Sequence, residues 1–119
     1  MHQKESPNYK RVLVKLSGQS LTGEQSFGIE PKIIAYYAQS LGELYHMGVE
    51  IAVVIGGGNF YRGAELSQAG IERITADQIG MLGTIMNCLA LRDALERFDV
   101  PCNIMSAIPI QGLVDSYDR

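Results

Sequence analysis

The sequence predicts an α/β protein: a three-layer αβα sandwich with a mainly parallel sheet, which these 119 residues form only in part. Three observations lead to this fold class. Strand-like runs alternate with amphipathic helical runs, and the run at 49–55 is too apolar for a strand with one face in water. The last predicted strand is followed by a loop that leaves a sheet edge open, so we expect a truncated fold.

The composition is that of an ordinary globular protein, with 46% hydrophobic, 8% aromatic and 19% charged residues, and it excludes a disordered chain. A formal net charge of −3 offers no cationic stripe for a nucleic-acid backbone. Uninterrupted apolar runs such as 51–55 are too short to span a bilayer, and the polar N-terminus lacks the apolar core of a signal peptide. We therefore expect a cytoplasmic protein with neither a nucleic-acid nor a membrane partner.

Two parts are expected along the chain: residues 1–8 form a polar arm, and residues 9–119 form one α/β unit. The β-branched run Arg11–Leu16 predicts a strand. Pro31 suits the first position of a helix, because its missing N–H would be unpaired there anyway. Apolar side chains follow at three- and four-residue spacing, at Ile34, Tyr37, Ala38, Leu41, Leu44 and Tyr45. Gly48 is expected to end this helix in the left-handed conformation.

A second strand is predicted at 49–55 and is expected to be covered on both faces, so that strand, helix and strand form a βαβ unit. A second helix is predicted from Thr75 to about Phe98. Thr75 and Gln78 have the spacing of a capping box, in which Thr75 is the N-cap. A third strand is predicted at 100–105.

The two cysteines, Cys88 and Cys102, have no CxxC spacing, and His2 and His46 are the only histidines. These are too few soft ligands for a zinc site, and no residue is assigned as a metal ligand. We interpret both thiols as reduced, small apolar side chains of the core.

The segment Gly56-Gly57-Gly58-Asn59 directly follows the predicted buried strand. Glycines can adopt positive φ and bring several backbone N–H groups against a phosphate, whereas the alternative is a tight turn without a ligand. Tyr61 breaks the dinucleotide-binding pattern, and Ala64 stands where a Walker loop needs its lysine. The sequence therefore predicts a phosphate-binding loop of another kind.

Three charged side chains lie near this loop or near the first predicted strand end. Lys15 can reach phosphates as a point charge, and Arg62 can bind a phosphate in bidentate fashion. Asp77 is expected in the first helical turn, where it either compensates the helix dipole or accepts hydrogen bonds from sugar hydroxyls. Gly80 and Gly83 are costly inside a helix, which indicates close approach by a ligand or by another backbone.

Several segments together resemble the bacterial uridylate (UMP) kinases of the amino acid kinase superfamily. They are residues 9–18 with Lys15-Leu16-Ser17-Gly18, residues 27–29, residues 53–59 with Arg62-Gly63, residues 77–84, residues 105–109 and residues 115–117. The resemblance implies an amino acid kinase-like fold, of which this chain is the N-terminal, acceptor-nucleotide half. It also implies phosphoryl transfer from Mg-ATP to UMP, giving UDP, with Mg²⁺ carried by ATP and no protein ligand assigned.

The resemblance further implies roles for individual residues. Lys15 and Arg62 are the expected catalytic side chains. The expected ATP-binding residues are Lys15, Leu16, Ser17, Gly18, Gly58 and Arg62. Gly57 and Asp77 are expected to bind UMP, Gly57 through its backbone N–H and Asp77 through the ribose.

Regulation and assembly are also implied by the resemblance: GTP as activator, UTP as inhibitor, and a homo-oligomer that is a hexamer in the family. The expected effector residues are Gly23, Glu24, Gln25, Ser26, Phe27, Gly28 and Arg92. Glu96 and Asn103 stand where GTP-activated enzymes are expected to carry basic side chains, which leaves the GTP response open. Two alternatives to a UMP kinase remain: a non-catalytic nucleotide-binding or assembly fragment, and a superfamily kinase that acts on a carboxylate or carbamate.

Overall fold

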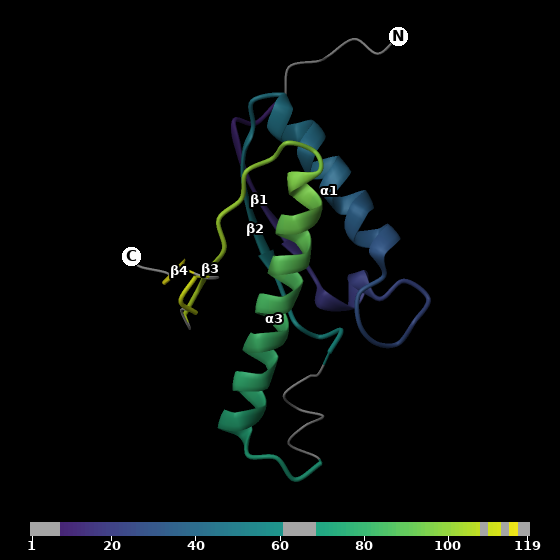
Figure 1. Cartoon of the computed structure of the whole chain (residues 1–119), viewed down its shortest axis with the longest axis vertical. Helices are drawn as coiled ribbons and strands as arrows, with labels where there is room; N and C mark the ends of the chain where they lie inside the picture. Colours follow the sequence, from purple (N-terminus) through teal and green to yellow (C-terminus); the bar gives the residue numbers. More distant parts are fainter. Residues whose placement is uncertain (1–7, 61–68, 108–109, 113–114, 117–119) are drawn as a thin grey trace.

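The computed structural model describes residues 8–60, 69–107, 110–112 and 115–116 (Figure 1). Its elements are, in chain order, β1 (Arg11–Leu16), the short 3-10 helix η1 (Gly18–Leu21), α1 (Pro31–His46), β2 (Glu50–Ile55), α3 (Arg73–Glu96), β3 (Met105–Ser106) and β4 (Asp115–Ser116). The two long helices lie side by side and pack against each other (Figure 1). Arg62 lies outside the described residues, and so does Gly63.

Strands β1 and β2 pair in parallel, from Arg11 opposite Glu50 to Leu16 opposite Ile55. The predicted βαβ unit is therefore confirmed, with α1 as its crossover helix. An ion pair of 2.7 Å between Arg11 Nε and Glu50 Oε2 joins the first residues of the two strands.

Helix α1 begins and ends as its sequence predicts. Pro31 occupies the first helical turn, and the Glu30 carboxylate accepts a hydrogen bond of 3.2 Å from the Lys32 backbone N–H. At the other end Gly48 follows the C-cap residue Met47 and has a φ of 92°, which only glycine adopts without strain.

Helix α3 begins at Arg73, so the capping box predicted at Thr75 is wrong. The N-cap residue is Glu72, whose carbonyl accepts a hydrogen bond of 2.9 Å from the Ala76 N–H. This backbone bond starts the helix before Thr75, and it places Asp77 beyond the first turn, contrary to prediction.

Among the described helices α3 alone is long and apolar enough to cross a membrane by length and composition, a test that core helices of soluble proteins also pass. Its buried residues are Ala76, Gly83, Ile85, Asn87, Leu91, Ala94 and Leu95. Because its C-terminal half packs on α1 and on the sheet, we interpret α3 as a core helix.

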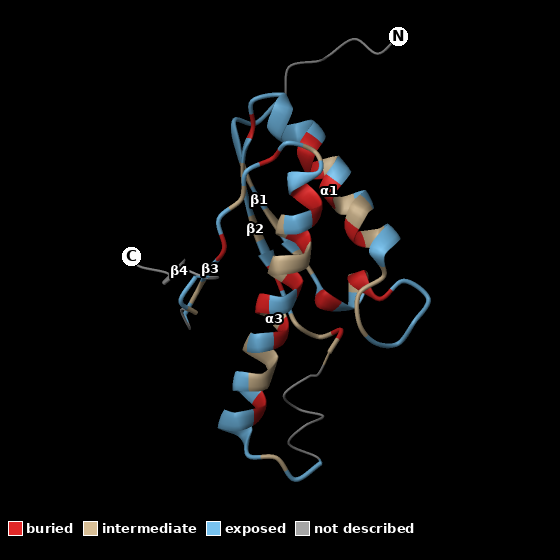
Figure 2. Cartoon of the chain, viewed as in Figure 1, coloured by how far each residue is buried: buried red, intermediate tan, exposed pale blue. Residues whose placement is uncertain are grey.

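The main core lies between the two helices and one face of the β1–β2 sheet (Figure 2). Its buried members are Leu21, Ile34, Ala38, Leu41, Ile55, Leu91, Ala94, Leu95 and Val100. The other sheet face is open, since the exposed fraction is 59% for Leu13 and 54% for Val54. The described residues thus form two of the three layers. The prediction that 49–55 is covered on both faces is wrong for this chain, because both helices cover the same face.

The third predicted strand is also wrong for most of its length. Only Met105 of the run 100–105 lies in a strand, and β3 pairs in parallel with β4 in a separate two-stranded sheet. A groove of about 1030 Å³ lies between β2 and the 100–105 segment. This separation explains why residues 100–104 find no strand partner among the described residues.

Candidate functional site

The candidate site is the glycine loop, residues 56–59, at the carboxyl end of β2. The Gly56 N–H donates to the Leu16 carbonyl at 3.1 Å, so the ends of β1 and β2 lie side by side. The turn at Ser17-Gly18 therefore meets the loop. A Cβ atom added to Gly18 would lie 2.6 Å from the Gly56 carbonyl oxygen and 2.6 Å from the Gly58 nitrogen. Ligands of parallel α/β sheets bind at such strand ends.

Close approach to helix α3 explains the glycine at position 57. A Cβ atom there would lie 2.6 Å from the Gly80 carbonyl oxygen and 2.8 Å from the Thr84 nitrogen, distances that real Cβ atoms do not show. Positive φ is not the reason, contrary to the sequence-based argument, because neither Gly56 nor Gly57 adopts it.

Glycine inside α3 was expected to allow close approach by a ligand or by another backbone, and the two glycines of α3 differ in this respect. At Gly83 another backbone is the neighbour, because the Gly57 carbonyl oxygen would lie 3.4 Å from an added Cβ atom. At Gly80 no atom of the described residues lies within 4 Å of that position, so space beside the helix stays open.

Three backbone N–H groups of this site have no hydrogen-bond acceptor among the described residues: those of Gly18, Gly57 and Gly58. Gly18 is buried, and the other two glycines are half-buried. Buried N–H groups without a partner are rare in folded proteins, because each loses its hydrogen bond to water. Clustered backbone donors of this kind bind anions such as phosphate.

Two buried asparagines hold the loop, and the sequence analysis assigned neither a role. Asn59 is 1% exposed and Asn87, on α3, is 0% exposed. Each side-chain Nδ2 donates to the other's Oδ1, at 2.9 and 2.7 Å. Asn59 Nδ2 also donates to the Gly28 carbonyl at 3.0 Å, and Asn87 Nδ2 donates to the Gly56 carbonyl at 2.7 Å. The sequence indicated this role only through Asn87, a polar residue among the apolar residues that α3 buries.

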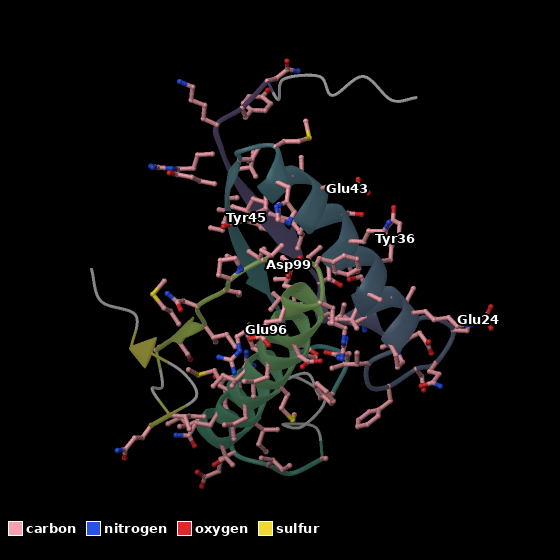
Figure 3. All side chains as sticks on the ribbon, turned by 45° about the horizontal axis from the view of Figure 1, so that its top comes forward. Glu24, Tyr36, Glu43, Tyr45, Glu96 and Asp99 are labelled. Atoms are coloured by element: carbon pink, nitrogen blue, oxygen red, sulfur yellow. The ribbon has the colours of Figure 1, made fainter. Side chains whose placement is uncertain are left out.

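The predicted effector loop, residues 23–28, contacts the glycine loop. The Gly28 N–H donates to the Asn59 carbonyl at 2.8 Å, and the rings of Phe27 and Phe60 lie edge to face with centroids 5.7 Å apart. Glu24 points outward from this loop (Figure 3), and residues 23–27 are exposed. The loop is thus linked to the site, but effector binding stays a prediction.

Arg92, the remaining predicted effector residue, is half-buried on α3, and its charge lowers the pKa of Cys102. Burial raises the pKa of Cys102 more strongly, and Glu96 raises it too. Burial and the neighbouring Cys102 raise the pKa of Cys88. Both thiols are free and stay protonated at neutral pH, in agreement with their interpretation as reduced side chains.

The predicted side chains of the site differ in their surroundings. Lys15 is exposed on the sheet face opposite the helices, one residue before β1 ends. Ser17 caps η1, with its Oγ accepting a hydrogen bond of 3.3 Å from the Ser20 N–H. The Asp77 carboxylate is exposed and pairs with Arg73 at 3.2 Å, a contact that neither expected role included. Arg62 lies outside the described residues, so its convergence on the loop is untested.

The groove beside β2 is a separate feature, lined by residues such as Val53, Leu95 and Ile104 and by neither Lys15 nor Gly56–Gly58. At the glycine loop itself the available donors are backbone N–H groups, which hold anions rather than cations. The described residues contain no cluster of three His, Cys, Asp or Glu side chains that could hold a metal ion. We therefore assign no residue of the described part to Mg²⁺ and no step to that ion.

The chain is similar to known proteins that are uridylate kinases. The chain is 58% identical over 111 residues to the uridylate kinase of Legionella pneumophila strain Corby, and 54% identical over 116 residues to that of Marinobacter nauticus. These matches cover 93% and 98% of this chain but 45% and 48% of the relatives. The chain thus spans about half the length of the curated relatives it matches.

Solved structures give the same result. The UMP kinase of Bacillus anthracis matches with a TM-score of 0.84 and 38% identity, over 92% of this chain and 46% of that one. The UMP kinase of Ureaplasma parvum matches with a TM-score of 0.84 and 32% identity. The model of the amino acid kinase family matches residues 10–118. The predicted fold is therefore confirmed, and this chain belongs to the amino acid kinase family.

Proposed function

We propose that this chain is the acceptor-nucleotide part, residues 9–119, of a UMP kinase, which transfers a phosphoryl group from Mg-ATP to UMP and gives UDP. The observation that carries the proposal is a cluster of N–H groups, those of Gly18, Gly57 and Gly58, that have no acceptor among the described residues and lie at the carboxyl ends of two parallel strands. The names of the relatives support UMP as the acceptor.

The chemistry suits a site built from backbone donors. Phosphoryl transfer requires positioning and charge stabilisation more than covalent catalysis. In the proposal the Gly57 N–H binds the phosphate of UMP, while the N–H groups of Gly18 and Gly58 bind phosphates of ATP. Lys15 and Arg62 stabilise charge on the transferred group, and Asp77 binds the UMP ribose.

The chain alone is expected to have negligible turnover. It spans less than half of its relatives, and one face of its sheet, with Leu13 and Val54, is exposed. Other parts of the proposal concern the whole protein: a role in pyrimidine nucleotide biosynthesis, a cytoplasmic location, a hexamer, activation by GTP through residues 23–28 and Arg92, and inhibition by UTP. These stay predictions.

A chimera tests the proposal. This chain replaces the matching part of the Legionella pneumophila uridylate kinase, and transfer from ATP is measured as ADP release with UMP, CMP, carbamate or acetate as the acceptor. We expect turnover with UMP and none from the 119-residue chain alone. Preference for carbamate or acetate would contradict a UMP kinase and favour the carboxylate or carbamate alternative. A folded chimera that phosphorylates no acceptor would favour the non-catalytic fragment.

A further inference from the structure

The paired side chains of Asn59 and Asn87 use their full donor capacity at the glycine loop. An amide side chain has two N–H donors, and each of the four donors of this pair has an acceptor. The acceptors Gly28 O and Gly56 O are backbone carbonyls, which cannot donate, so they fix which way each amide is turned. A buried polar network that is fully satisfied holds one arrangement of the groups around it.

The bond from Asn87 determines where one unpartnered N–H points. Gly56 O and Gly57 N belong to the same peptide unit, which is planar and trans, so the carbonyl and the N–H point in opposite directions. Since Asn87 Nδ2 holds the Gly56 carbonyl at 2.7 Å, the Gly57 N–H points away from Asn87.

The neighbouring N–H is fixed by a different contact. The Gly57 carbonyl accepts a hydrogen bond of 3.0 Å from the Phe60 N–H, within the turn that follows the strand. The same planar geometry then sets the direction of the Gly58 N–H without help from Asn87. The two donors of the glycine loop therefore depend on different partners.

We propose that Asn59 and Asn87 are positioning residues that aim the Gly57 N–H at the phosphate of the acceptor nucleotide. Asn87 holds the peptide unit directly, and Asn59 orients Asn87 while tying the loop to Gly28. This inference rests on the proposed function. It gives the buried pair Asn59 and Asn87 a role in binding the acceptor, in addition to a role in folding.

The test uses the 119-residue chain and the variants Asn87→Leu, Asn59→Leu and the double variant. Leucine is close to asparagine in shape. Each single variant leaves the amide of the other asparagine without its partner. The double variant removes both amides and leaves only the Gly28 and Gly56 carbonyls without a side-chain donor, so it should restore part of the stability. Thr84→Val on the same helix is the matched control, because its hydroxyl donates only to Gly80 within α3, at 3.2 Å.

Two readouts are measured: UMP and ATP affinity by titration, and the amide ¹⁵N NMR signals of Gly57 and Gly58. We expect Asn87→Leu to weaken UMP binding about tenfold, the value of one net hydrogen bond, and ATP binding far less. Because Asn87 holds the peptide unit that carries the Gly57 N–H, its loss should move the Gly57 signal more than the Gly58 signal. The double variant should regain part of the thermal stability but not UMP affinity, and Thr84→Val should change neither affinity.

A merely structural role predicts that UMP affinity follows stability and recovers with it in the double variant, which would overturn the inference. Equal movement of the Gly57 and Gly58 amide signals would overturn it as well. If the unmodified chain does not bind UMP and the chimera does not phosphorylate it, the proposed function is wrong. The comparison of the two amide signals still decides whether the asparagines orient the Gly57 N–H.

Discussion

Lys15 is an exposed side chain near the end of β1, and nothing in the described core depends on its ammonium group. In the chimera, Lys15→Ala should lower turnover about 10²–10³-fold, the usual loss for one preorganised donor to developing charge. The unfolding free energy should change by less than about 0.5 kcal/mol, since surface substitutions rarely cost more. UDP formation and urea unfolding measure the two effects. Unchanged turnover would remove Lys15 from the catalytic residues.

Asp77 has two possible uses for its carboxylate, and its partner Arg73 separates them. The exposed ion pair at 3.2 Å contributes at most about 1 kcal/mol to stability. Asp77→Asn and Arg73→Gln both break this pair, so they should lower the melting temperature by similar small amounts. Only Asp77→Asn should raise the apparent KM for UMP in the chimera, by about tenfold if one strong hydrogen bond to the ribose is lost. Equal KM values in the two variants would show that the Asp77 carboxylate serves only the ion pair with Arg73.

The two cysteines give a prediction for alkaline pH. Burial raises the pKa of both thiols above the ordinary value of 9.0, so above this pH the unfolded chain loses protons that the folded chain keeps. Their contribution to stability is complete below pH 9 and is lost as pH rises further. The variant Cys88→Ala/Cys102→Ala should therefore lose less unfolding free energy than the unmodified chain between about pH 8 and pH 10. Equal losses, measured by urea unfolding, would contradict the burial of the thiols.

Among the structural elements, the glycine loop and α3 are in contact, and this contact predicts that alanine at Gly57 and at Gly80 will change the stability in opposite directions. Gly57→Ala places a Cβ atom 2.6 Å from the Gly80 carbonyl and should destabilise the fold by about 1–3 kcal/mol, the usual cost of overpacking. Gly80→Ala meets no atom of the described residues outside its own helix turn within 4 Å and should stabilise α3 by up to about 1 kcal/mol. Urea unfolding measures both. Destabilisation by Gly80→Ala would show that the space beside α3 is filled.

The Gly80→Ala substitution also tests whether the acceptor nucleotide lies beside α3. If the open space beside Gly80 receives part of the acceptor, Gly80→Ala should weaken UMP binding although it stabilises the helix. Gly83→Ala is the matched comparison within α3, because its Cβ would touch the Gly57 carbonyl at 3.4 Å.

Elements whose signals are local could be predicted from the sequence. Helix α1 follows Pro31 and ends before Gly48, because fixed φ and positive φ act within a few residues. Elements that depend on distant partners could not be predicted. Helix α3 begins before the capping signal at Thr75, because the Ala76 N–H donates to the Glu72 carbonyl. Residues 100–104 have no neighbouring strand among the described residues.

The candidate site was predictable in part for the same reason. Three consecutive glycines after an apolar strand indicated the loop, and Ser17-Gly18 indicated the turn that meets it. The reason for glycine at position 57 is a helix backbone far along the chain, which spacing does not reveal. The Asn59–Asn87 pair joins residues distant in sequence, so only the fold brings its amides together.

At the scale of the whole molecule, the open sheet face and the groove beside β2 fit a family member that is incomplete. Leu13 and Val54 lie exposed where a further layer would cover them, and the chain covers 46% of the Bacillus anthracis UMP kinase structure. The N–H groups that we propose to bind phosphate nevertheless all belong to this chain, in η1 and in the glycine loop after β2. The binding part of the site can therefore be tested separately from turnover.

The central claim is that the N–H groups of Gly18, Gly57 and Gly58 bind phosphate. Titration of the ¹⁵N-labelled chain with UMP or with ATP, followed by amide NMR, tests it most directly, with uridine as the control that lacks the phosphate. We predict that UMP moves the amide signal of Gly57 more than any other, that ATP moves the signals of Gly18 and Gly58, and that uridine leaves all three in place. UMP-induced shifts confined to other amides, or equal shifts with uridine, would contradict the account.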